Sequence, residues 1–131
     1  MKTKSYFLSL LIGLIFLSCQ KAPINGDLDG QWQVVEVTPK PAQVNIQQRI
    51  YYNFSLHVCS LSYYGGTLAY ANMRYSGDEL YLDFPSLEGN ESLTLRQYGI
   101  LSNPVVFNVK FTDRHHLILS NDESVVMLVK L

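Results

Sequence analysis

The stretch that best predicts the fold is ANMRYSGDELYLDF, residues 71–84. Apolar side chains occupy every second position on both sides of Gly77, as in strands that turn one face toward a core. A two-residue hairpin turn favours glycine at its first position, because that residue takes a positive φ. The pairs expected across this turn, all pointing inward, are Tyr75–Leu80, Met73–Leu82 and Ala71–Phe84.

The same period of two recurs in both directions along the chain. It is found at Ile50, Tyr52, Phe54, Leu56 and Val58, at Phe107, Val109 and Phe111, at Leu117 and Leu119, and at Val125, Met127, Val129 and Leu131. Three-residue loops at 113–115 and 121–123 would join the last three of these segments. The pairs expected across them are Phe111–Leu117 and Leu119–Val125. We therefore predict an all-β, antiparallel up-and-down meander of seven or eight strands that closes into a small barrel, with an open sandwich as the alternative.

Two stretches lack this alternation. Residues 38–48 contain Pro39 and Pro41 and are expected to form an irregular connection. Residues 92–98 are compatible with a short helix that ends at Gly99 or with an extra strand, and the sequence leaves both open.

The N-terminus carries a targeting signal. Two lysines precede an apolar run at residues 6–17, which is shorter than the about 20 residues that cross a bilayer as a helix. The run ends at Ser18 and Cys19, which resemble the lipobox of bacterial lipoproteins, where the cysteine is acylated and becomes the first residue. We expect a signal peptide at 1–18 and a lipidated Cys19, with an ordinary signal peptide and an incidental cysteine as the alternative.

A polar tether is expected at residues 19–27 and the folded domain at 28–131. In the lipoproteins that this leader resembles, an aspartate after the acylated cysteine can retain the protein in the inner membrane, and Gln20 stands at that position. The resemblance implies an outer-membrane lipoprotein, held to the membrane by its lipid, that faces the periplasm or the cell surface.

The charge of the chain argues against one class of partner. Outside the leader, eight Lys and Arg stand against eleven Asp and Glu, and they form no basic run. Binding to a phosphate backbone requires clustered positive charge. We therefore expect no nucleic-acid partner.

The start of the folded domain carries a family signal. The motif GQW at residues 30–32 places Gly-x-Trp at the first strand, where lipocalin-type barrels begin. Together with the leader, the predicted meander and the segments YGI at 98–100 and NP at 103–104, this domain resembles the lipocalin-like lipoproteins of Bacteroidota. The resemblance covers residues 28–131 and implies a lipocalin-like β-barrel.

The resemblance also implies roles for three residues as a barrel plug. Trp32 would close one end of the barrel, and Gly30 would let the incoming chain cross that end closely. Lys130, or alternatively Arg114, would lie over the indole ring, where lipocalins usually carry an arginine.

The predicted inward positions supply candidate ligand contacts. The aromatic candidates are Tyr52, Phe54, Tyr75, Phe84, Phe107 and Phe111. Glu36 would share the face of Trp32 and place a carboxylate at the barrel mouth, as a group that orients a ligand or as a solvated rim residue. Apolar rings with a few polar groups are typical of ligand pockets, but the same rings can also fill a small barrel.

No arrangement in the sequence points to catalysis, a metal or a cofactor. His115 and His116 are adjacent, so on a strand they point to opposite faces rather than toward one ion. Cys59 lies two residues from His57, but a nucleophile also needs activation and a pocket, and neither is indicated. We expect Cys59 to be an unpaired, unreactive thiol and the protein not to be an enzyme.

Two functions fit these observations. The first is a lipid-anchored binding module of the envelope that holds a small apolar or amphiphilic molecule. The second is a non-enzymatic protein–protein interaction module, whose filled barrel presents outward tyrosines to an envelope protein. These tyrosines are Tyr51, Tyr63, Tyr64, Tyr70 and Tyr81. A cavity of about 300 Å³ or more inside the barrel would favour the first function, and a packed interior would rule it out.

Overall fold

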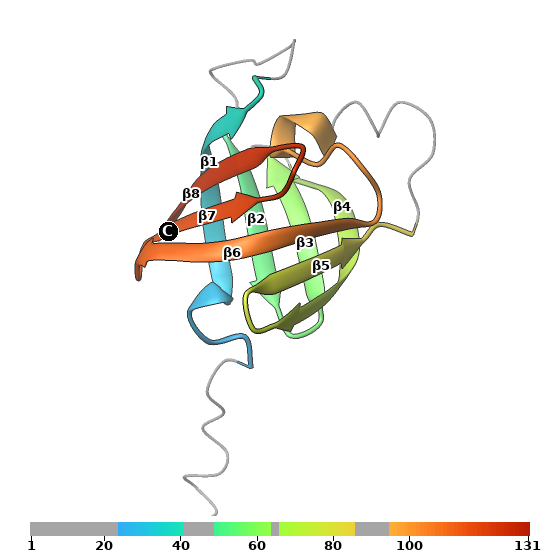
Figure 1. The fold of residues 1–131 in the computed structure, drawn as a ribbon. Coiled ribbons are helices and arrows are strands. Elements are labelled where there is room, and N and C mark those ends of the chain that lie inside the picture. Colours follow the sequence, from blue (N-terminus) through green and yellow to red (C-terminus); the bar gives the residue numbers. More distant parts are fainter. Residues whose placement is uncertain (1–23, 41–48, 64–65, 86–94) are drawn as a thin grey trace, which may run out of the picture.

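Strands with one apolar face must bury that face against another layer or against each other. In the computed structural model, which describes residues 24–40, 49–63, 66–85 and 95–131, eight antiparallel strands follow one another around a closed barrel (Figure 1). The strands are β1 (Gly30–Thr38), β2 (Ile50–Ser55), β3 (Val58–Tyr63), β4 (Gly66–Ser76), β5 (Glu79–Asp83), β6 (Val105–Asp113), β7 (His116–Ser120) and β8 (Val125–Lys130). Two short 3-10 helices, η1 (Gly26–Leu28) and η2 (Arg96–Tyr98), precede β1 and β6.

Several predictions from the sequence fall outside the described residues. These are the signal peptide, Cys19 and most of the tether, the greater part of the irregular stretch at 38–48, and Tyr64. Among the residues that are described, none belongs to a helix long and apolar enough to cross a membrane.

β1 closes the barrel because it pairs with a strand on each side. Trp32 faces Tyr52 on β2 and Lys130 on β8. Each of the eight described strands therefore has two hydrogen-bonded neighbours, and their backbone groups are paired within the barrel. The predicted closed meander is confirmed, and the open sandwich is excluded.

The β4–β5 hairpin has the predicted register. Tyr75 pairs with Leu80 and Met73 with Leu82. Gly77 takes a φ of 60° at the first position of the turn. The alternation of the strands and the turn residue agree here, so residues close in sequence determine the pairing.

The β6–β7 hairpin also pairs as predicted, although its loop differs. Phe111 lies opposite Leu117, but the register then shifts and Asp113 pairs with His116. The extra residue is a β-bulge at Thr112, and it shortens the expected three-residue loop to two residues.

The single strand predicted at residues 50–58 is wrong. The chain reverses at Leu56 and His57, and Ser55 pairs with Val58 across this turn. Leu56 and Val58 are exposed, and Cys59 and Leu61 take the inward positions instead. The apolar alternation runs through the turn without a glycine or an asparagine to mark it, which is why the sequence pattern concealed the reversal.

The inward face predicted for the last strand is also wrong. Val126 and Leu128 are buried, whereas Val125 and Met127 are exposed. Every residue at 125–129 is apolar, so alternation does not distinguish the two faces of β8. The turn before β8 therefore decides which side chains of β8 point inward.

The turn before β8 contains four residues rather than three. The Asn121 carboxamide oxygen accepts hydrogen bonds from the backbone N–H groups of Glu123 and Ser124, both at 2.9 Å. This Asx-type turn places Leu119 opposite Val126 instead of opposite Val125. The inward and outward faces of β8 are therefore exchanged relative to the prediction.

Of the two alternatives for residues 92–98, the described part forms a helix. η2 ends at Gly99, which adopts a left-handed φ of 77°. A Cβ at Gly99 would lie 2.2 Å from Cγ2 of Val126. Glycine is required here both by the backbone conformation and by the close approach of β8.

Candidate functional site

Trp32 closes the end of the barrel at which η1 lies. The side chain is fully buried, and its indole N–H donates a hydrogen bond of 2.8 Å to the carbonyl of Leu28. The ring of Phe111 packs against it at a centroid distance of 6.2 Å. The buried ring with a satisfied N–H makes this end a solid plug.

Lys130 and Gly30 complete this end. The Lys130 Nζ lies 5.4 Å from the centroid of the Trp32 ring and donates a hydrogen bond to the carbonyl of Asp27. The cation is therefore placed for a cation–π interaction. Gly30 has a φ of 128°, and a Cβ there would lie 3.0 Å from Cε of Lys130. Both the backbone conformation and the lysine stem favour glycine at this position.

Glu36 does not face the barrel interior. The register of β1 against β8 shifts between Val34 and Glu36, so Val35 is the extra residue of a β-bulge. The bulge reverses the alternation, and Val37 is buried while Glu36 is exposed on the outside. Glu36 therefore does not place its carboxylate inside the barrel, and the predicted inward position is wrong.

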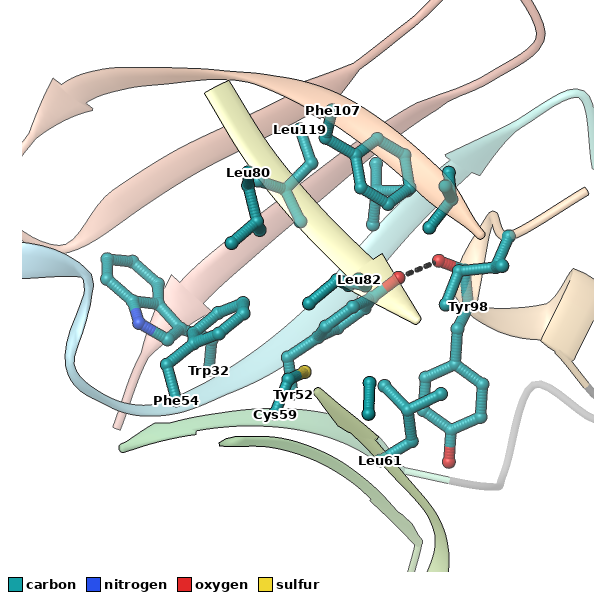
Figure 2. Close-up of a cluster of buried hydrophobic side chains, with 14 of the residues drawn as sticks. Trp32, Tyr52, Phe54, Cys59, Leu61, Leu80, Leu82, Tyr98, Phe107 and Leu119 are labelled. Carbon is teal, nitrogen blue, oxygen red and sulfur yellow. Dashed lines mark hydrogen bonds between the residues drawn. The ribbon is translucent and has the colours of Figure 1, made fainter. Parts of the chain in front are cut away.

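A cluster of buried aromatic and aliphatic side chains occupies the middle of the barrel, and Figure 2 shows part of it. The ring of Tyr52 stacks on that of Phe54 at 5.8 Å and meets the ring of Tyr98 edge-on at 5.7 Å. The Tyr52 hydroxyl donates a hydrogen bond to the backbone carbonyl of Tyr98. Burial raises the pKa of Tyr52 well above its ordinary value, so this hydroxyl stays protonated and able to donate.

The six aromatic candidates divide into two groups. Tyr52, Phe54, Phe84 and Phe107 are buried in the packed core. Tyr75 and Phe111 are half-buried and pack against it from the positions next to turns. All six rings belong to the buried cluster or pack against it, and their role as ligand contacts stays a prediction.

The opposite end of the barrel, called the mouth below, is covered by η2. Tyr98 is buried there, and its hydroxyl donates a hydrogen bond of 2.7 Å to the carbonyl of Ser62 on β3. The Ser124 hydroxyl donates one of 2.6 Å to the carbonyl of Gly99. Burial raises the pKa of Tyr98. Because these bonds join η2 to β3 and to the turn before β8, η2 is held across the mouth at several points.

Three partly exposed side chains lie on the strand ends near Ser62, whose carbonyl accepts the hydrogen bond from Tyr98. Ile50 pairs with Tyr63 at the ends of β2 and β3, and both continue the inward faces of their strands. Leu68 is the bulged residue of β4 and packs partly against the core. Ile50, Tyr63 and Leu68, defined here as the mouth rim, form an apolar surface next to a buried tyrosine.

Sequence reasoning did not select Ile50, Leu68 or Tyr98 as site residues. It placed Tyr63 among the outward tyrosines, which is wrong, because Tyr63 continues the inward face of β3 with Cys59 and Leu61. Ile50 was placed only as one more member of an inward strand face, and Leu68 lies in a segment without clear alternation. The segment at residues 98–100 contributed to the family resemblance, but it did not predict the two hydrogen bonds of Tyr98. Both bonds join segments that are far apart in sequence.

The remaining reactive side chains form no catalytic or metal-binding arrangement among the described residues. Cys59 is a free, buried thiol whose pKa burial raises, while His57 lies exposed in the β2–β3 turn. The exposed pair of His116 and Asp113 has Nδ1 at 2.8 Å from Oδ1. This hydrogen bond, with one from the backbone N–H of His115, lowers the pKa of Asp113.

The sequence of the chain matches a known family. The family model of the lipocalin-like domain covers residues 14–131. The chain therefore belongs to the lipocalin-like family, as its Gly-x-Trp motif and meander predicted. Proteins of this fold generally bind other molecules rather than transform them, so the fold supports a binding module.

Two solved structures share the fold at low identity. A lipocalin-like protein from Bacteroides uniformis is 17% identical and superposes with a TM-score of 0.57, over 81% of this chain and 100% of its own. An uncharacterized protein from Bacteroides eggerthii is also 17% identical, with a TM-score of 0.53 over 79% of this chain and 98% of its own. No curated protein gives a significant match. At this identity the likeness establishes the fold alone.

Proposed function

We propose that this protein is a lipid-anchored binding module of the bacterial outer membrane, and that it holds a small apolar or amphiphilic molecule at the mouth of its barrel. The observation that carries the proposal is the mouth rim. Ile50, Tyr63 and Leu68 present partly exposed apolar surface on inward strand faces, beside the hydroxyl of Tyr98. Apolar surface with a few fixed polar groups is the usual composition of a ligand site.

The buried rings disfavour a ligand held inside the barrel, which is the form of this function expected from the sequence, so we place the ligand at the mouth instead. Tyr52 spans the interior and bonds to the carbonyl of Tyr98, which lies directly beneath the mouth. A molecule could enter more deeply only by breaking this bond and displacing close-packed rings. A shallow seat on the mouth rim requires neither change.

The lipid anchor is supported by the sequence of the leader. The apolar run ends directly before Ser18 and Cys19, and Ile24, the first described residue, follows Cys19 by five positions. A single acyl chain gives only weak membrane binding, whereas a multiply acylated cysteine anchors a protein stably. Replacement of Cys19 by Ser should therefore release the protein from the membrane fraction.

Native mass spectrometry of the domain, purified from its source and freed of its lipid, tests the ligand. We expect a population heavier than the protein by the mass of one small molecule. Binding of a fluorescent fatty acid then locates the site. Ile50→Ser should weaken it about fivefold, since partial burial of an isoleucine contributes on the order of 1 kcal/mol. Val106→Ser is the matched control, because Val106 is exposed on the outside of β6. Equal affinities of the two variants would contradict the mouth as the site.

The packed interior also favours a second candidate, a protein–protein interaction module. Tyr70 is exposed on the outer face of β4, and Tyr81 on β5 lies under Arg74, whose guanidinium carbon is 4.6 Å from the ring centroid. Aromatic and arginine side chains are common anchors at interfaces. A native mass spectrum with a bound protein and no bound small molecule would favour this candidate.

A further inference from the structure

Three exposed apolar side chains lie at the plug end of the barrel, away from the mouth. The exposed fractions are 54% for Ile24, 61% for Leu56 and 44% for Val58. Asn25, next to Ile24, donates a hydrogen bond of 2.8 Å from Nδ2 to the carbonyl of Leu56. The chain that enters the barrel is thus joined to the tip of the β2–β3 hairpin. Ile24, Leu56 and Val58 are called the basal patch below.

The backbone of Leu56 is unusual for an apolar residue. It has a φ of 54°, and among the described residues no other residue except glycine has a positive φ. Glycine, asparagine and aspartate are the residues that commonly occupy this conformation at a hairpin tip, because a branched side chain is crowded there. Leu56 is therefore unfavourable in two respects, its conformation and its exposure. Such a residue at a projecting tip points to a role outside the folding of the domain.

The short tether restricts what the basal patch can meet. Ile24 follows Cys19 by five residues, and a chain of five residues spans at most about 18 Å. If Cys19 carries the lipid, as the proposed function requires, the plug end stays within that distance of the membrane surface. The mouth, at the other end of the strands, lies farther from the anchor.

Charge does not account for an attraction to the membrane. Among the described residues, the charged groups on or bonded to the segment that enters the barrel are Asp27, Asp29 and Lys130. The Asn25 side chain donates to Asp29, and the Lys130 ammonium donates to the carbonyl of Asp27. Two carboxylates and one ammonium give no basic surface of the kind that binds anionic lipids. The His57 side chain, beside Leu56, is exposed.

We propose that the basal patch inserts into the boundary between the headgroups and acyl chains of the membrane that carries the lipid anchor, and so orients the mouth away from that membrane. The inference rests on the proposed anchor. Apolar side chains supply the attraction, so docking should occur on vesicles of phosphatidylcholine alone and should change little with added salt or anionic lipid. An upright barrel turns the mouth rim toward the aqueous compartment.

Site-specific quenching of a fluorophore tests this orientation. The full lipidated chain, carrying Leu56→Cys labelled with a small fluorophore, is reconstituted into phosphatidylcholine vesicles. Cys59 is buried and does not compete for the label. Val125→Cys is the matched control, because Val125 is exposed, apolar and paired with Thr38 at the mouth end. Nitroxide-labelled lipids should quench position 56 at least about threefold more than position 125, and aqueous iodide should show the reverse preference.

The outcomes separate the docking from the anchor. Wild-type protein should float with the vesicles, and Cys19→Ser should float far less. If the wild type does not float, the anchor is wrong and the docking falls with it. If it floats but iodide quenches both positions equally, the docking alone is refuted. Protection of position 56 from iodide without quenching by the lipids would show that a protein covers the patch, which also refutes the proposal.

A second variant guards against an effect of the label. Leu56→Asn suits the positive φ, so it should fold at least as well as the wild type. In the Cys19→Ser background it should lower the residual partitioning into vesicles about fivefold, since the leucine side chain no longer enters the bilayer. Val125→Asn should leave the partitioning unchanged. Equal partitioning of Leu56→Asn and its parent would contradict the insertion of Leu56.

Discussion

The two ends of the barrel are closed in different ways. At the plug end a single large ring, Trp32, is covered by Lys130 and bonded to a carbonyl four residues away. At the mouth the cover is η2, which hydrogen bonds from Tyr52 and Tyr98 join to the strands. The plug is part of the strands themselves, whereas the cover of the mouth is a separate segment held by a few polar contacts. Loss of the Trp32 ring should therefore affect global stability more than a substitution at the mouth.

The largest effect is expected at the plug. Trp32→Ala should lower the free energy of unfolding by about 3–5 kcal/mol, as for other buried large aromatic side chains. Stabilities of domains are commonly about 5–15 kcal/mol, so this loss approaches unfolding. Denaturant titration followed by circular dichroism measures the loss, with Val106→Ala as an exposed control. A red-shifted, readily quenched emission from Trp32 in the native wild type would contradict its burial.

A smaller loss is expected where the mouth cover meets β8. Gly99→Ala should cost about 3 kcal/mol, because the new Cβ would meet Val126 and the φ of 77° disfavours alanine. Gly26→Ala is the matched control. Its φ is 60°, but nothing lies within 4 Å of the new Cβ, so only the conformational cost of about 1–2 kcal/mol should appear. The same loss in both variants would show that the contact with Val126 has no effect.

The hydroxyl of Tyr98 tests the polar attachment of η2. Tyr98→Phe leaves the carbonyl of Ser62 without this donor, and we expect a loss of about 1–2 kcal/mol. The effect should be local, so hydrogen exchange at residues 95–100 should accelerate more than exchange in β6 and β7. A uniform acceleration across the barrel would contradict the view of η2 as a separately attached cover.

The smallest effect is expected for the cation over the plug. Lys130→Met keeps the apolar stem and removes the ammonium, and the loss should be about 0.5–1 kcal/mol. A double-mutant cycle with Trp32→Phe isolates the interaction of the ammonium with the indole. A coupling energy of zero would show that Lys130 acts only through its bond to the carbonyl of Asp27.

The sequence predicted those parts of the fold in which local signals agree. Gly77 marks the β4–β5 turn, and the alternation on both sides gives the observed register. The Gly-x-Trp motif identified the family, and the position of Trp32 in the structure is that of a plug. Neither inference needed information from distant segments.

The errors arose where the alternation of a strand is reset. A β-bulge at Val35 moved Glu36 to the outside, an unmarked turn at Leu56 divided one predicted strand into two, and the turn at Asn121 exchanged the faces of β8. A shift by one residue moves every later side chain to the opposite face. The pattern of one strand cannot reveal such a shift, because either face of the strand carries side chains that could point inward.

The sequence alone determined the class of fold, the family and the apolar content of the inward faces, because these depend on composition and on local periodicity. Tertiary structure decided which residues form the mouth rim and how η2 is attached. Ile50, Leu68 and Tyr98 come from three separate segments, and the carbonyls that accept from Tyr52 and Tyr98 are 46 and 36 residues away. Closure of the barrel brings these groups together, since the register of every strand must satisfy both neighbours at once.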